Sequence, residues 1–314
     1  MKKIPIPLVS IIIRTKDRPK LLTRAIESVY SQTYPNIEII VINDGGADVL
    51  AIINHFKNIP IEGKLIRNIQ YVSNDESHQR PAAANIGFQV STGDYLGLLD
   101  DDDYFFADHI STHISYLLKQ ESKISFSKAT ESIEDYDEVI NQNRRFAHFP
   151  STYSKLSLLF FDNYFPINSF IFHKSVLENI GMFDESKKVL EDWDFIIRLI
   201  INYEPIIINK VTAEYTTRIG WFNIRQDKNQ KSLWKETFSE IRKKYKKQLA
   251  ESNLSLPISE ISDFLSEVAQ ERYTLVKENE ELRDSFAFKL FYHPYYSKIK
   301  KLAKLLHLTK IIKR

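Results

Sequence analysis

The fold of this chain is decided by residues 95–103, which read Tyr-Leu-Gly-Leu-Leu-Asp-Asp-Asp-Asp. An uncharged run, Tyr95 to Leu99, passes without a spacer into four aspartates. A short continuous apolar run bounded by polar residues is typical of a strand that is covered on both faces. The stretch therefore predicts a buried strand that carries acidic side chains at its carboxyl end.

The residues before this stretch alternate between β-branched runs and helical periodicity. The predicted strands are residues 8–13, 37–42, 69–73 and 95–99, and the predicted helices are residues 21–30, 49–56 and 81–90. Pro19 precedes the first helix, where its fixed φ suits the first turn. Strand and helix in this order predict an α/β fold with a mostly parallel central sheet flanked by helices.

Polar side chains follow three of the predicted strands. The strand ends read Arg14-Thr-Lys-Asp17, Asn43-Asp-Gly-Gly46 and Asp100-Asp-Asp-Asp103. Ligands of parallel α/β sheets bind at the carboxyl ends of the strands. We therefore expect these three segments to converge on one crevice.

The four aspartates repel one another unless a cation neutralises them. On extended backbone, Asp100 and Asp102 share one face, and Asp101 and Asp103 share the other. Two carboxylates at that spacing suit Mn²⁺ or Mg²⁺ bound jointly with a diphosphate. The alternatives are a solvated acidic loop and a structural Ca²⁺ site, and the buried strand just before the acids favours a catalytic metal.

The amino-acid composition excludes several classes of protein and of functional site. The chain has 314 residues, 43% of them hydrophobic and 27% charged, which is typical of a folded globular protein of one or two domains. Cysteine is absent, which excludes disulfides, iron–sulfur clusters and thiol nucleophiles. The formal net charge of +2 gives no overall attraction to nucleic acid.

The ordered motifs resemble glycosyltransferase family 2 over about residues 7–220. The segments that carry the resemblance are Val9–Arg18, Gln32–Gly45, Ala84–Gly87, Ser91–Tyr95 with Leu99–Asp103, Ile180–Glu185 and Glu191–Phe195. The resemblance implies the GT-A fold, a nucleotide-sugar donor, a divalent metal and inversion at the anomeric carbon.

Residue by residue, the resemblance implies that Thr15 and Asp44 line the nucleobase and ribose pocket. It places residues 100–102 at the DXD region of the family: Asp102 is the expected direct metal ligand, and Asp100 and Asp101 are expected to contact ribose or metal. The chain departs from the family at Ala84-Asn85, where many relatives carry Arg-Asn.

The departure makes Arg80 the candidate replacement for the missing arginine. It lies four residues earlier than Ala84, which is one helical turn away. We therefore count Arg80 among the expected donor-binding residues.

The resemblance assigns Asp192 as the general base. A sugar hydroxyl needs a carboxylate within hydrogen-bond reach to take its proton. An apolar stripe at residues 193, 196, 197 and 200 predicts a helix anchored in the core with Asp192 in its first turn. An acid that only stabilises a helix N-terminus is the alternative. Asp194 is expected to pair with Arg198 within the helix.

His109 and His113 have the spacing of one helical turn. We expect this pair to flank a surface helix rather than to bind zinc.

The last third of the chain differs from the rest, because residues 221–314 contain no glycine. We predict a catalytic domain at 1–225, a helical extension at 226–285 and a basic amphipathic tail at 286–314. A seven-residue apolar repeat from Ile261 to Leu282 makes a coiled coil and a homo-oligomer possible, with a helix docked on the catalytic domain as the alternative.

From Phe286 to Arg314 the tail carries eight Lys or Arg residues and no acids, interleaved with aromatic and aliphatic side chains. Such a segment favours an anionic membrane surface. Nucleic acid and a merely solvated basic surface are the alternatives, and we do not expect nucleic acid as a partner.

The sequence thus predicts a metal-dependent inverting glycosyltransferase that moves a sugar from a nucleotide-sugar donor to a glycan or lipid-linked acceptor in surface polysaccharide synthesis. We expect it in the cytoplasm, peripheral at the inner face of the cell membrane. The alternatives are a sugar nucleotidylyltransferase and a non-catalytic scaffold with a degenerate transferase domain. The glycine-rich loop expected of the nucleotidylyltransferase is missing near Arg14–Arg18.

Overall fold

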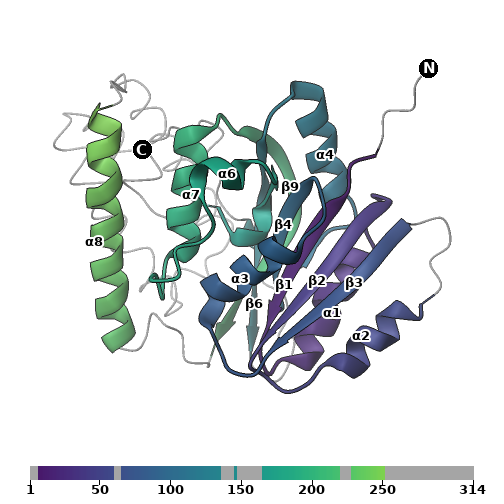
Figure 1. Ribbon diagram of the computed structural model, residues 1–314. Helices are drawn as coiled ribbons and strands as arrows, with labels where there is room; N and C mark the ends of the chain where they lie inside the picture. Colours follow the sequence, from purple (N-terminus) through teal and green to yellow (C-terminus); the bar gives the residue numbers. More distant parts are fainter. Residues whose placement is uncertain (1–5, 60–64, 136–144, 147–164, 220–227, 252–314) are drawn as a thin grey trace. The chain divides into compact units, whose positions relative to one another are not determined.

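A computed structural model describes residues 6–59, 65–135, 145–146, 165–219 and 228–251 (Figure 1). The chain divides into two compact units, residues 1–147 with 163–245 and residues 148–162 with 246–314. Only the backbone of 246–251 is described in the second unit, so the architecture below is that of the first.

The described elements are nine strands, seven α-helices and a short 3₁₀ helix. The strands are β1 Val9–Thr15, β2 Asn36–Asp44, β3 Leu65–Asn74, β4 Tyr95–Asp100, β5 Tyr104–Phe105, β6 Ile124–Asp135, β7 Arg145–Phe146, β8 Phe170–His173 and β9 Ile206–Ile219. The helices are α1 Pro19–Tyr30, α2 Leu50–Lys57, α3 Gln79–Val90, α4 His109–Gln120, α6 Val176–Ile180, α7 Glu191–Asn202, α8 Lys228–Glu251 and the 3₁₀ helix η1 Ile167–Ser169. All four strands and three helices predicted for the first hundred residues are confirmed.

The nine described strands form one mixed sheet of order β3-β2-β1-β4-β8-β6-β9-β5, with β7 paired to β6. Strands β1, β2, β3 and β4 are parallel to one another, and β6 is parallel to β9. Strand β8 is antiparallel to both β4 and β6, so β6 and β9 run in the same direction as β4. Six of the nine strands therefore share one direction, which confirms the mostly parallel sheet.

Helices cover both faces of the sheet (Figure 1). Alternate residues of β1 pack on opposite faces of the sheet. Ile11 and Ile13 belong to a buried cluster with side chains of α1, α2 and α4. Ile12 packs against α3 on the other face, where a Cβ at Gly87 would lie 2.3 Å from Ile12 Cγ2. Every residue of β1 is buried, which explains why the strand carries apolar side chains on both faces.

The aromatic cluster on the α3 side joins the sheet to α7. Phe88 of α3 contacts Phe172 of β8 at 5.8 Å and Phe195 of α7 at 5.9 Å between ring centroids. All three side chains are buried. This packing fixes α7, and with it the predicted base, against the sheet.

His109 and His113 are fully buried, so the expectation that they lie on a surface helix is wrong. Nδ1 of His109 lies 2.7 Å from the hydroxyl of Thr212, and Nδ1 of His113 lies 2.7 Å from the hydroxyl of Ser125. The Nε2 atom of each ring has no hydrogen-bond partner among the described residues. The two histidines can be buried because hydroxyl groups on β9 and β6 provide hydrogen-bond partners for their Nδ1 atoms.

This histidine pair predicts acid-sensitive stability. Burial lowers the pKa of His113 to about 3, and burial with the charge of His113 lowers the pKa of His109 well below its usual value. In the unfolded chain both histidines bind protons near pH 6.5, whereas in the folded chain they stay neutral to much lower pH. The free energy of unfolding is therefore highest above pH 6.5 and falls as the pH drops toward 3. Each histidine contributes a slope of up to about 1.4 kcal/mol per pH unit.

Urea unfolding between pH 7.5 and 5 tests this expectation. His109→Asn/His113→Asn should flatten the dependence of the unfolding free energy on pH, because amides do not titrate. His55→Asn is the matched control, since His55 is exposed. An equal slope in wild type and double variant would contradict the prediction.

Helix α8 begins the predicted helical extension, and residues up to Tyr245 belong to the first compact unit. The boundary at 225 stays a prediction. The possible coiled coil within 226–285 lies largely outside the described residues, and the basic tail at 286–314 lies entirely outside them. Among the described helices, none combines the length and apolar character needed to span a bilayer.

Candidate functional site

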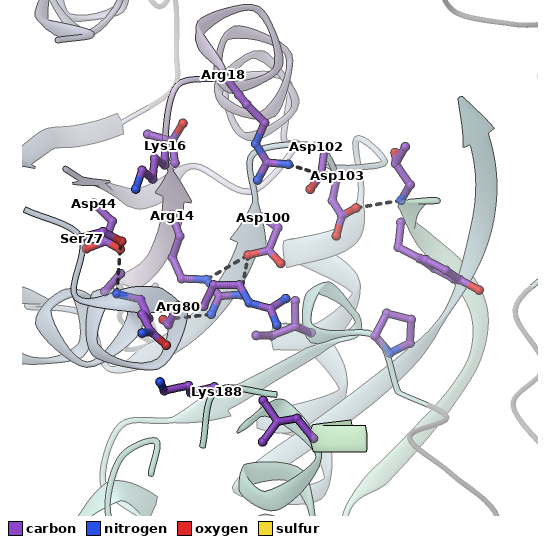
Figure 2. A pocket seen from close by; sticks show the side chains of 18 residues that line it. Arg14, Lys16, Arg18, Asp44, Ser77, Arg80, Asp100, Asp102, Asp103 and Lys188 are labelled. Atoms are coloured by element: carbon purple, nitrogen blue, oxygen red, sulfur yellow. Dashed lines mark hydrogen bonds and ion pairs between the residues drawn. The ribbon is translucent and has the colours of Figure 1, made fainter. Parts of the chain in front are cut away.

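A pocket of about 760 Å³ lies at the carboxyl ends of the parallel strands, where all three predicted strand ends contribute to it (Figure 2). One part of its lining is charged and comes from β1, β2 and β4 with the residues that follow them, from α3 and from the loop before α7. The lining residues of this kind are Arg14, Lys16, Arg18, Asp44, Arg80, Asp100, Asp102, Asp103 and Lys188. The other part includes Pro166, Ile167, Tyr215 and Leu233.

Asp44 closes one end of the pocket by holding the loop before α3. Its Oδ1 accepts from the His78 amide at 2.9 Å, and its Oδ2 accepts from the Gln79 amide at 2.9 Å and the Ser77 hydroxyl at 2.7 Å. Burial alone would raise the pKa of Asp44, but these hydrogen bonds lower it below its usual value. Asp44 is thus a fixed anion in the lining, and its contact with ribose or nucleobase stays a prediction.

Gly45 allows this contact between strand and loop. It has φ of +71°, and a Cβ there would lie 2.6 Å from the backbone of Glu76 and Ser77. A side chain at this position would push the loop away from Asp44.

Asp100 forms a charge network with two arginines and Glu191. Its Oδ1 accepts from Arg14 Nε at 2.9 Å and Nη2 at 2.5 Å. Arg14 also donates to the Arg80 carbonyl at 3.1 Å, and Arg80 Nε lies 3.2 Å from Glu191 Oε1. Burial alone would raise the pKa of Asp100, but Arg14 and Arg80 lower it. Arg80 therefore lies in the pocket and connects β4 to the first turn of α7.

Asp101 and Asp102 are paired with Arg18. Arg18 Nη2 lies 2.5 Å from Asp101 Oδ1, and its Nη1 donates to Asp102 Oδ2 at 2.9 Å. Thr15 also donates to Asp101 Oδ2 at 2.7 Å. Burial raises the pKa of Asp101 to about 7 against the opposing effect of Arg18. Asp101 is fully buried and is not among the lining residues, whereas Thr15 and Asp102 are.

Asp103 departs from the face expected for it. Extended backbone would turn it away from Asp102, yet both line the pocket. The chain turns at residues 101–102, which breaks the alternation of a strand. Asp103 accepts from the Thr216 amide at 2.8 Å, and burial and the neighbouring Asp102 raise its pKa.

Asp192 lies in the first turn of α7, as predicted. It is half-buried, and its Oδ1 accepts from the Trp193 amide at 2.8 Å. Burial and the charge of Glu191 raise its pKa to about 6, against the opposing effect of Arg80. Asp192 is not among the lining residues, but Arg80 and Glu191 connect its position to the lining. A carboxylate with this pKa is ionised at neutral pH and basic enough to accept a proton.

Three of the four described non-glycine residues with left-handed backbone occur around the pocket. They are Asp17 at φ +56°, Gln79 at φ +74° and Leu190 at φ +60°. Asp17 lies between two lining residues, Gln79 lines the pocket, and Leu190 comes directly before Glu191. Non-glycine residues adopt this conformation uncommonly, and bulky ones such as Leu190 do so at a steric cost that surrounding contacts offset.

The sequence did not identify Glu191, Lys188 or Leu233 as site residues. Glu191 is buried and pairs with Arg80, and its Oε2 has no hydrogen-bond partner among the described residues. Lys188 and Leu233 reach the pocket from the loop before α7 and from α8. The Glu-Asp pair at the start of α7 could have identified Glu191 as a site residue from the sequence. Lys188 and Leu233 reach the pocket only through long-range packing, which the sequence does not show.

Two of the acidic residues at the strand ends are candidate ligands for a divalent cation. No group of three or more His, Cys, Asp or Glu side chains in the described part of the chain is arranged to hold a metal. Asp100 and Asp102 nevertheless give two carboxylates to one pocket, and Mg²⁺ is often held by one or two carboxylates with substrate phosphates. Arg14 and Arg18 already form ion pairs with these acids, so a bound ion would share the two carboxylates with the arginines. The donor set fits such an ion.

Comparison with known proteins identifies the chain's relatives. The sequence model described as "Glycosyl transferase family 2" matches residues 10–181. The uncharacterized glycosyltransferase YwdF of Bacillus subtilis is 27% identical over 199 residues, which are 62% of this chain and 69% of YwdF. The Escherichia coli UDP-Glc:alpha-D-GlcNAc-diphosphoundecaprenol beta-1,3-glucosyltransferase WfaP is 33% identical over 128 residues, which are 40% of this chain and 47% of WfaP.

The fold has a counterpart among solved structures. A crystal structure of residues 1–349 of S. aureus TarS in complex with UDP-GlcNAc superposes with a TM-score of 0.55 at 16% identity. The match covers 84% of this chain and 80% of the TarS chain. The expected GT-A architecture is thus confirmed.

Proposed function

This chain belongs to glycosyltransferase family 2, and from that premise we propose that it transfers a sugar from a UDP-sugar to a glycan or lipid-linked glycan acceptor in surface polysaccharide synthesis. The observation that carries the proposal is the pocket in which Asp44, Asp100 and Asp102 meet at the strand ends, beside the helix that bears Asp192. The uracil nucleotide is supported by WfaP, whose name specifies UDP-Glc, and by TarS, which was solved with UDP-GlcNAc.

The donor's nucleoside end fits beside Asp44. Its carboxylate is held by the loop at Ser77–Gln79, and Thr15 and Lys16 line the same pocket. Carboxylate and hydroxyl groups are suited to hydrogen bonding with ribose hydroxyls and the base. The diphosphate then extends toward Asp100 and Asp102, where Arg14, Arg18 and Arg80 supply positive charge.

Asp100 and Asp102 would hold Mn²⁺ or Mg²⁺ together with the diphosphate. Such an ion supplies Lewis-acid stabilisation of the negative charge that gathers on a leaving nucleoside diphosphate. Arg18, whose side chain is 28% exposed, would turn from Asp102 toward the phosphates when the donor binds. Arg14 stays as the partner that keeps Asp100 ionised.

Asp192 acts as the base toward the acceptor. It accepts the proton of the attacking hydroxyl, and the oxygen displaces the nucleoside diphosphate from the opposite side of the anomeric carbon, which inverts that centre. Glu191 and Arg80 fix the first turn of α7 during this step. Pro166, Ile167, Tyr215 and Leu233 offer an apolar wall for the face of an acceptor sugar.

A screen of nucleotide sugars tests the assignment of class and donor. One UDP-sugar should raise the melting temperature in the presence of Mn²⁺ and much less in its absence. A ligand at one hundred times its Kd stabilises a protein by about 2.7 kcal/mol. Release of UDP from the same donor should accompany the shift. A shift caused only by nucleoside triphosphates and sugar phosphates would favour the nucleotidylyltransferase instead.

The pKa of Asp192 predicts the acid limb of the pH profile. Only the carboxylate can accept a proton, so kcat/KM should rise about tenfold per pH unit at low pH and level off above about pH 6. Asp192→Glu should retain an acid limb with a different midpoint. A profile that stays flat between pH 5 and 8 would contradict the role of Asp192.

A further inference from the structure

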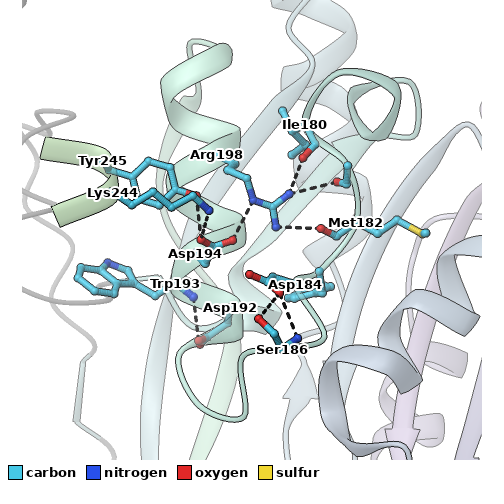
Figure 3. Close-up of polar contacts among 12 residues, drawn as sticks. Ile180, Met182, Asp184, Ser186, Asp192, Trp193, Asp194, Arg198, Lys244 and Tyr245 are labelled. Carbon is cyan, nitrogen blue, oxygen red and sulfur yellow. Dashed lines mark hydrogen bonds and ion pairs between the residues drawn. The ribbon is translucent and has the colours of Figure 1, made fainter. Parts of the chain in front are cut away.

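A second polar cluster, centred on Asp194, connects α7 to α8 (Figure 3). Asp194 is fully buried, two residues after the base. Its Oδ2 accepts from Arg198 Nε at 2.9 Å, which confirms the predicted pair within the helix. Its Oδ1 accepts from the Tyr245 hydroxyl at 2.8 Å and from Lys244 Nζ at 3.1 Å. The two carboxylate oxygens of Asp194 thus have partners on two different helices, Oδ2 on α7 and Oδ1 on α8.

Arg198 extends the cluster to the segment that leads into the pocket. Its guanidinium donates to the carbonyls of Ile180 at 2.5 Å and Met182 at 2.8 Å (Figure 3). The chain continues from Met182 through Lys188, which lines the pocket, to the left-handed Leu190 and α7. Movement of Asp194 would therefore disturb both sides of the turn that precedes the base.

An aromatic stack holds the same two helices together. The ring of Trp193, the residue after the base, stacks on Phe238 with centroids 4.7 Å apart and planes at 11°. Phe238 in turn stacks on Trp234 at 4.9 Å and 17°. The residue before Trp234, Leu233, lines the pocket. Helix α8 thus contacts the two residues that follow the base and also reaches the site itself.

We propose that Asp194 and Tyr245 are positioning residues for the transfer reaction, and that α8, through this pair and the Trp193–Phe238 stack, sets the orientation of Asp192. The inference rests on the proposed function, in which Asp192 is the base. A buried carboxylate that loses one donor shifts toward its remaining partners, because an unsatisfied buried charge is costly. A displacement of about 1 Å at a catalytic group can cost about a hundredfold in rate.

The test compares two Tyr→Phe variants in the intact chain. Tyr245→Phe removes the hydroxyl that Asp194 accepts, and Tyr116→Phe makes the same change at a 40% exposed tyrosine of α4. UDP release from UDP-glucose and from UDP-GlcNAc is measured with Mn²⁺ across pH, with calorimetry of UDP binding. We expect Tyr245→Phe to lower kcat at least tenfold and to move the acid limb of the pH profile. The KM for donor and the Kd for UDP should stay within twofold of wild type.

Amide hydrogen exchange supplies a readout that needs no turnover. Tyr245→Phe should speed exchange in residues 191–195 while the sheet is unaffected, and Tyr116→Phe should change neither. Lys244→Met removes the ammonium that contacts Asp194 from a side chain that is 52% exposed. It should give a smaller effect of the same kind, and it replaces Tyr245→Phe as the test variant if Tyr245→Phe fails to fold.

Two results would overturn the proposal. One is unchanged kcat and unchanged exchange at 191–195 in a folded Tyr245→Phe or Lys244→Met. The other is a loss of activity that comes entirely from weaker UDP binding. If wild type neither binds UDP nor consumes either donor, the proposed function fails, and the exchange measurement still decides whether α8 positions the start of α7.

Discussion

Asp192→Asn is expected to abolish sugar transfer while leaving donor binding nearly intact. The amide keeps the shape and the hydrogen bond from the Trp193 amide at 2.8 Å, but it cannot accept a proton. Loss of a general base typically costs about 10²–10⁴-fold in rate. The measurement is kcat for UDP release in the presence of acceptor, together with the Kd for UDP.

The control for this variant is Asp75→Asn, the same change at an exposed aspartate that does not line the pocket. It should keep wild-type rates. If Asp192→Asn weakened UDP binding in parallel with kcat, Asp192 would instead be an acid that stabilises the helix N-terminus. If Asp192→Asn kept its rate, the base would have to be sought elsewhere, and the buried Glu191 would be the next candidate.

Asp102→Asn is expected to lower turnover at least a hundredfold and to raise the Mn²⁺ concentration needed for half-maximal activity. At the proposed metal site, removing one of two carboxylates would weaken the binding of the divalent ion and reduce the positive charge available to the leaving diphosphate. Turnover measured over a Mn²⁺ titration gives both quantities. Asp108→Asn is the control, because Asp108 is 37% exposed and its ion pair with Lys210 lies at the surface, where ion pairs contribute little.

Asp102 also pairs with Arg18 at 2.9 Å, so an effect through that ion pair has to be separated from an effect on the metal. Arg18→Met breaks the same pair and leaves the carboxylate in place. If Asp102 binds metal, Arg18→Met should leave the half-saturating Mn²⁺ concentration unchanged or lower it. Equal losses in both variants with no change in Mn²⁺ dependence would contradict a metal ligand at Asp102.

The parallel half of the fold was predictable because local signals decided it. The runs at 8–13, 37–42 and 95–99 carry apolar side chains on both faces, and the sheet buries both faces. Convergence of Asp44 with Asp100 and Asp102 then followed from parallel strands alone. The alternation of strands and helices along the chain was enough to predict that these residues meet.

The rest depended on partners distant in sequence. His109 and His113 are polar, yet Thr212 and Ser125 on β9 and β6 provide the hydrogen bonds that allow burial. The turn at residues 101–102 brings Asp103 into the pocket. The spacing of apolar residues in the sequence does not predict this turn. Tyr245 lies 51 residues after Asp194, so their hydrogen bond could not be read from either segment.

The left-handed residues Asp17, Gln79 and Leu190 have a consequence for anyone who sets out to make this enzyme more heat-resistant. Glycine relieves the roughly 1–2 kcal/mol of steric cost that a side chain carries in this conformation, so a screen for higher melting temperature will tend to select it there. Glycine also widens the range of backbone angles open to the unliganded protein. Variants that survive heating through these three substitutions should be the ones that turn over most slowly, and durability should be sought in the distant half of the sheet instead.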